Sequence, residues 1–116
     1  MINAILSMLI TILFVLAVHE AGHALAIIFT RAGQIKRMVV CLKGVGVEWE
    51  PYGYEPIKRS IVSLSGSAVN ILFAVIFYSV GLDALGLANL VFGVVNLLPF
   101  PGADGLRAFA SLKEAA

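Results

Sequence analysis

The stretch Val15–Ile28, VLAVHEAGHALAII, places two histidines and a glutamate inside an otherwise apolar segment. In the middle of a membrane, each ionisable side chain costs roughly 2.5 to 3.5 kcal/mol on insertion scales unless it is paired or binds a ligand. His19, Glu20 and His23 have the spacing HExxH, in which residues four apart share a helix face and both imidazoles reach one metal ion. The alternative is a pair of ordinary interior histidines. We favour a metal site because the chain has only two histidines and both belong to this motif.

The composition indicates a lipid environment. Of the 116 residues, 60% are hydrophobic and only 13% are charged, which gives more apolar surface than a soluble core of this size could hide. We expect one membrane domain over residues 1–116. The net charge of +1 gives no indication of a nucleic-acid partner, and a single cysteine, Cys41, allows no internal disulfide.

The apolar runs predict three transmembrane helices, judged against the ~20 residues that cross the hydrocarbon core. The first run lacks a basic N-terminal region and is too long for the apolar part of a cleaved signal, so we expect it to be retained. The third run is short. The predicted spans are about Ala4–Thr30, Ser60–Leu82 and Ala84–Leu98.

The segment between the first two spans, Arg31–Arg59, contains six of the eight basic residues and is expected to face the cytoplasm. The N-terminus and Asp83 then face outward, in a multi-pass integral membrane protein. Residues 35–50 carry β-branched residues on both sides of Lys43, which predicts a β-hairpin in this first cytoplasmic loop. A solvated basic loop without a hairpin is the alternative.

A catalytic zinc site normally has three protein ligands, so a third must join the two histidines. Asp83 belongs to the opposite membrane boundary. The third span covers only about 23 Å before Pro99, so the Pro/Gly-broken segment PFPGADG stays at membrane depth, where irregular backbone must face protein or a cavity. This favours Asp104, with Glu48 or Glu50 next. The full set of candidates is Cys41, Glu48, Glu50, Glu55, Asp83, Asp104 and Glu114.

These residues resemble the site-2 protease family of intramembrane zinc metalloproteases. Besides HExxH, the stretch NLLPFPGADG matches the family pattern Asn-x-x-Pro-x-Pro-x-x-Asp-Gly, and SGSAVN is a weaker match, with Ser67 where proline is usual. The resemblance implies a three-helix catalytic core without the additional helices, PDZ domain or CBS domain of various relatives. The residues that match the longer pattern are Asn96, Pro99, Pro101, Asp104 and Gly105.

The resemblance also implies a zinc ion held by His19, His23 and Asp104, with Glu20 as general base. Asn70 and Asn96 would be polar residues near the site, although hydrogen bonding between helices explains them equally well. The same packing role is the simplest explanation of three glycines, Gly66, Gly86 and Gly93.

The implied activity is zinc-dependent cleavage of a transmembrane segment of a single-span membrane protein, near the cytoplasmic side of a prokaryotic cytoplasmic membrane, as in regulated intramembrane proteolysis. A helical substrate must unwind first, and a strand edge at Val45 and Val47 could receive its freed backbone groups by β-addition. The sequence leaves open a homo-oligomer or an accessory membrane protein. Two other functions also remain as alternatives: a proteolytically silent metal-binding membrane module and a metal transporter.

Overall fold

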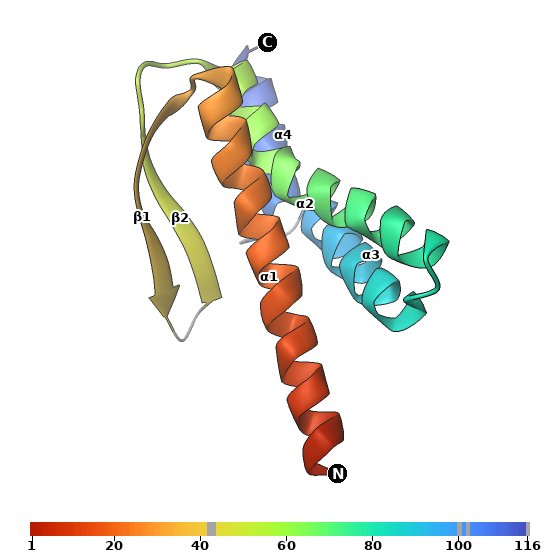
Figure 1. Cartoon of the computed structure of the whole chain (residues 1–116). Helices are drawn as coiled ribbons and strands as arrows, with labels where there is room; N and C mark the ends of the chain where they lie inside the picture. Colours follow the sequence, from red (N-terminus) through yellow and green to blue (C-terminus); the bar gives the residue numbers. More distant parts are fainter. Residues whose placement is uncertain (42–43, 100, 102, 116) are drawn as a thin grey trace.

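The described residues form four helices and one two-stranded antiparallel sheet (Figure 1). The computed structural model describes residues 1–41, 44–99, 101 and 103–115. Lys43, in the expected hairpin turn, lies outside these residues, and the side chain of Cys41 is likewise not described. The elements are α1 (Ile2–Thr30), β1 (Gly33–Cys41), β2 (Gly44–Pro51), α2 (Pro56–Ser79), α3 (Asp83–Leu97) and α4 (Asp104–Ala115).

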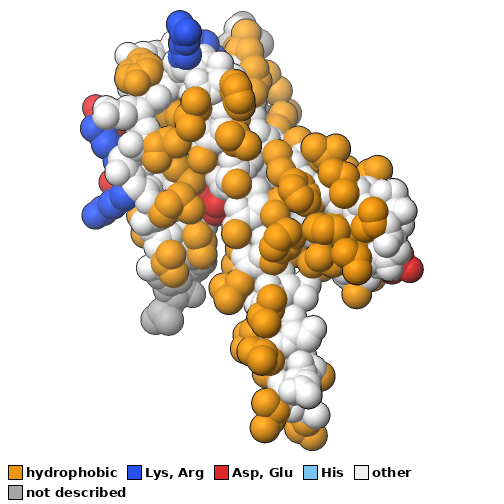
Figure 2. Space-filling view, in the orientation of Figure 1, with side chains coloured by type: hydrophobic (Ala, Val, Ile, Leu, Met, Phe, Trp, Pro, Cys, Tyr) orange, Lys and Arg blue, Asp and Glu red, His pale blue; other side chains and the backbone are white. Residues whose placement is uncertain are grey.

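Two helices, α1 and α2, are long and apolar enough to cross a membrane. The 29 residues of α1 extend about 43 Å, and the first turns of its N-terminal half project beyond α2 and α3 (Figure 1). In Figure 2, apolar side chains cover this half and the arm formed by α2 and α3, whereas Lys and Arg lie at the opposite end and along the hairpin. The apolar helix α3, of 15 residues, is shorter than the other two.

The second helix begins four residues earlier and ends three residues earlier than the predicted span. Proline is favoured in the first turn of a helix because its missing N–H has no partner there and its φ already suits the helix, so Pro56 starts α2. At the other end, Gly81 adopts a φ of 84°, which few other residues tolerate and which turns the chain towards α3.

The predicted hairpin is confirmed, but it does not extend into solvent as a loop. It folds back alongside α1 (Figure 1), because Ile35, Val47 and Trp49 pack against a buried cluster formed by α1, the residue Ala32 and α2. The opposite face carries the charges, paired across the strands as Arg37–Glu48 at 2.7 Å and Lys36–Glu50 at 3.2 Å. The buried cluster consists of Ala26, Ile27, Ala32 and Val62.

Two glycines let α1 and α2 come into backbone contact. A Cβ on Gly22 would lie 2.7 Å from the carbonyl oxygen of Ser65 and 2.9 Å from the Cα of Gly66. Gly93 and Gly86 play the same part between α3 and α2, where an added Cβ would lie 3.1 Å from Ile71 and from Tyr78, respectively. The predicted packing role of Gly66, Gly86 and Gly93 is therefore confirmed.

The last helix, α4, was not predicted. It packs on α2, where the hydroxyl of Ser60 donates to the carbonyl of Ala108 at 3.0 Å. Its sequence is amphipathic, with apolar and polar residues on opposite faces. Asp104 in the first turn and Lys113 in the last are further sequence signals for a helix. Helix α4 begins at Asp104, within the stretch PFPGADG, and its first residue lies against the histidines of α1.

We predict that Gly22→Leu destabilises the protein by about 1–3 kcal/mol or more, because the larger side chain forces α1 and α2 apart. Ala21→Leu is the matched control, since Ala21 is the exposed neighbour in the same helix. Chemical denaturation in detergent, followed by the emission of the single tryptophan, Trp49, compares the two variants. Equal stabilities would mean that the two helices do not depend on this close approach.

Candidate metal centre

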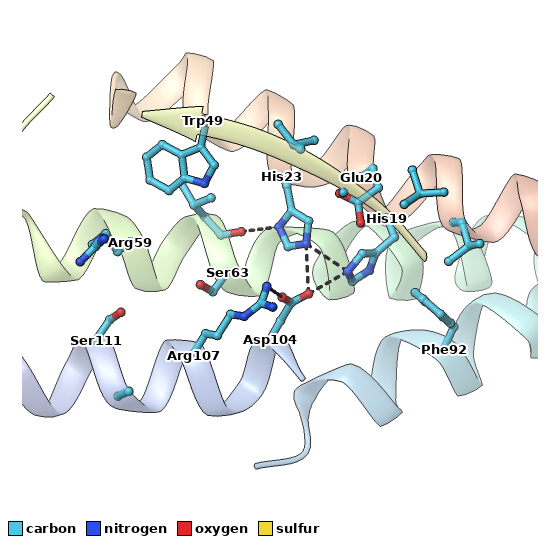
Figure 3. Close-up of a pocket in the computed structure, with 16 residues that line it drawn as sticks. His19, Glu20, His23, Trp49, Arg59, Ser63, Phe92, Asp104, Arg107 and Ser111 are labelled. Carbon is cyan, nitrogen blue, oxygen red and sulfur yellow. Dashed lines mark hydrogen bonds and ion pairs between the residues drawn. The ribbon is translucent and has the colours of Figure 1, made fainter. Parts of the chain in front are cut away.

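Three potential ligand atoms converge on one point between α1, α2 and α4 (Figure 3). The Nε2 atoms of His19 and His23 lie 3.0 Å apart, and the Oδ2 atom of Asp104 lies 2.7 Å from the first and 3.0 Å from the second. All three side chains are largely buried. The three predicted ligands thus meet at one place, although His19 and Asp104 are 85 residues apart in the sequence.

Each histidine is oriented by an acceptor on its other ring nitrogen. Nδ1 of His23 donates to the carbonyl of Val62 at 2.7 Å, and Nδ1 of His19 donates to Oδ1 of Asn70 at 2.8 Å. These bonds place the ring proton on Nδ1 and leave the lone pair on Nε2 directed at the convergence point. This is the arrangement by which proteins fix the tautomer of histidines that bind metals.

Asn70 belongs to a chain of buried hydrogen bonds that the sequence analysis recognised only in part. Its Nδ2 donates to the carbonyl of Val15 at 3.2 Å and to Oδ1 of Asn89 at 2.9 Å, and Asn89 in turn donates to the carbonyl of Leu85. Because both partners of Nδ2 are acceptors, Oδ1 must be the atom that faces His19. Asn89 was missed, although a fully buried asparagine in an apolar helix is the kind of signal that could have identified it.

The donor set fits a divalent metal ion. Two imidazole lone pairs and a carboxylate oxygen at 2.7–3.0 Å from one another repel unless a proton or a cation lies among them. A metal ligand must be deprotonated, so the site would hold the ion with the Asp104 carboxylate and two neutral imidazoles. Two imidazoles and a carboxylate are a protein ligand set typical of catalytic zinc.

Glu20 lies beside this centre and faces a cavity. One of its carboxylate oxygens is within 4.8 Å of the histidine ligand atoms, and the backbone N–H of Val47 in β2 lies next to the carboxylate. The cavity has a volume of about 730 Å³ and is lined on one side by β2, including Val45 and Val47. The strand edge thus borders the same space as the candidate metal centre and the candidate base.

The remaining candidates lie elsewhere. Glu48, Glu50 and Glu55 pair with Arg37, Lys36 and Lys58. Glu114 accepts a hydrogen bond from Tyr54, and Asp83 begins α3. Asn96 donates to the carbonyl of Phe92 in its own helix at 3.0 Å, so it does not join the network around His19. Of the alternative third ligands whose side chains are described, Asp104 alone reaches the histidines.

No family model matches the chain, and no curated protein matches it.

We predict that the purified protein binds one zinc ion and that His19→Ala, His23→Ala and Asp104→Asn each abolish binding. Asp83→Asn, the same chemical change at the far end of α3, leaves the metal content unchanged. Elemental analysis of the proteins in detergent measures the occupancy. Full zinc occupancy in Asp104→Asn would remove Asp104 from the ligand set.

We also predict that Asn70→Ala weakens zinc binding by about 10- to 100-fold, because His19 loses the acceptor that fixes its tautomer. Asn96→Ala is the control, since Asn96 bonds only to its own helix. Competition with a chelator of known affinity gives the dissociation constants. Equal constants for wild type and Asn70→Ala would show that Asn70 does not orient the ligand.

Proposed function

We propose that the chain is a zinc-dependent intramembrane endopeptidase of the site-2 protease type. The observation that carries this proposal is the meeting of His19, His23 and Asp104 within 3.0 Å of one another, with Glu20 next to them at the wall of a cavity. The surrounding helices are apolar, so these ionisable side chains cost free energy there and mark a functional site.

When bound, zinc would polarise a peptide carbonyl and lower the pKa of a coordinated water molecule towards ~7. Glu20 takes a proton from the attacking water and returns it to the leaving amine. Asn70 and Val62 keep the imidazoles in the required tautomer. Phe92 packs edge-on against His19, with 5.0 Å between the ring centroids, and closes the inner end of the site.

In this proposal α1, α2 and α3 cross the membrane, and the basic end of the molecule faces the cytoplasm. The exposed apolar side chains over these helices (Figure 2) support this placement. The 15 residues of α3 cover about 22 Å, less than a ~30 Å core. The start of α4 then lies below the membrane surface, where Ala103, Asp104 and Gly105 are buried.

The proposed substrate is a single transmembrane helix of another protein. An apolar groove of about 540 Å³ between α1 and α3 shares Leu16 and Phe92 with the cavity, so a helix in the groove adjoins the site. The edge of β2 that is not paired with β1 faces the cavity. Val45 and Val47 there can pair with the unwound backbone, which needs new partners where water is scarce.

Glu20 distinguishes this function from a silent metal-binding module or a transporter. Metal binding alone has no need of a carboxylate that lies beside the ligands and faces open space. A transporter needs polar ligands along a path through the membrane, whereas the polar groups found here collect at one depth. These features favour catalysis.

We predict that Glu20→Gln keeps its zinc and loses cleavage by at least about 100-fold, because a positioned base contributes about 10²–10⁴. Membranes from cells that express wild type or variant are compared by mass spectrometry of new peptide termini, which we expect within apolar segments. Glu50→Gln is the control, since Glu50 pairs with Lys36 on the far face of the hairpin. New termini that persist with Glu20→Gln would count against a peptidase.

A further inference from the structure

The cavity has one apolar end and one basic end. Leu16 and Phe92 line it beside His19, whereas Arg59 of α2 and Arg107 of α4 line it on the other side of Asp104. Figure 3 shows Phe92 at one end and Arg59 with Ser111 at the other. Arg59 lies in the first turn of α2, so the basic end is the one that opens towards the cytoplasm in the proposed orientation.

The carboxylates near this end are engaged with other partners. Glu48, Glu50 and Glu55 pair with Arg37, Lys36 and Lys58, and Glu114 accepts from Tyr54. Asp104 uses Oδ2 for the histidines, and its Oδ1 is 3.4 Å from Arg107, a long contact to a mostly exposed side chain. Among the described residues, Arg59 has no ion-pair partner and Arg107 has only this long contact, so both charges are available to an occupant of the cavity that they line.

We infer that Arg59 and Arg107 form a specificity site that selects substrates with an acidic side chain on the cytoplasmic side of the cleaved bond. This inference rests on the proposed function and deepens it. Arg107 lies three residues after Asp104, which is about 4.5 Å along α4. Ser111, at the same end of the cavity as Arg59 (Figure 3), lies seven residues after Asp104, which is about 10.5 Å along α4. An extended peptide covers ~3.3 Å per residue, so the selected position is the first to third residue from the cleaved bond.

The two arginines disfavour most membrane proteins as substrates. Transmembrane helices usually carry Lys and Arg at their cytoplasmic ends, and such a flank meets two like charges in this cavity. Repulsion of the common flank and attraction of the rare acidic flank act in the same direction, which is how specificity is usually obtained. A peptide is favoured over a lipid headgroup as the occupant because both arginines line the cavity that holds the metal centre.

The test measures binding, so that it does not depend on cleavage. The full chain with Glu20→Gln, loaded with zinc in zwitterionic nanodiscs, is titrated with fluorescent peptides. Each peptide has an apolar segment of about 20 residues and a flank of Asp or Lys, placed at either end because the binding direction is not fixed. We expect the Asp peptides to bind about 10-fold more tightly, as two partly exposed ion pairs allow, and Arg59→Glu with Arg107→Glu to reverse the preference.

Lys58→Glu is the matched control, because it makes the same charge change next to Arg59 but Lys58 pairs with Glu55 outside the cavity. An unchanged preference in this control and retained zinc in the double variant support the inference. Equal binding of the Asp and Lys peptides, or a preference that survives the double substitution, overturns it. The inference is also overturned if the double substitution changes binding to vesicles of anionic lipid without peptide. An acidic preference in a protein that cleaves nothing would overturn the proposed peptidase and leave the binding site standing.

Discussion

The close approach of α1 and α2 at Gly22 and Gly66 is the constraint on which the rest of the structure depends. A Cβ on Gly66 would lie 2.7 Å from Nε2 of His23 and 2.8 Å from the His19 ring. The same glycine contact that joins the helices therefore makes room for the imidazoles against α2. With any larger residue there, the histidines could not reach both their acceptors and Asp104.

The polar groups around His19 and His23 are stable because they form hydrogen bonds with one another. The amide of Asn70 links His19 to Asn89 and to the backbone of α1, and the carbonyl of Val62 holds His23. A buried network is favourable only when its members all find partners. The resulting rigidity serves the metal centre, since ligands held by a second layer of hydrogen bonds need little rearrangement to bind an ion.

The hairpin gives the centre its outer wall. Its apolar face packs on α1 and α2 through Trp49 and Val47, and its charges neutralise one another on the opposite face. This division lets a charged segment lie alongside an apolar helix. It also leaves the basic lining of the cavity to Arg59 and Arg107, on α2 and α4.

The sequence by itself determined the elements whose signals are local: the apolar helices, the hairpin, and the HExxH spacing that puts His19 and His23 on one face. It also favoured Asp104, because Pro99 was expected to interrupt the third apolar run before it covered the full hydrocarbon thickness. Only the tertiary structure decided that Asn70 rather than Asn96 orients a histidine, that Asn89 completes the network, that α4 packs on α2, and that the hairpin folds back to Glu20. Those outcomes depend on which faces of different elements meet, and a linear pattern contains period and spacing but not the rotation of one helix against another.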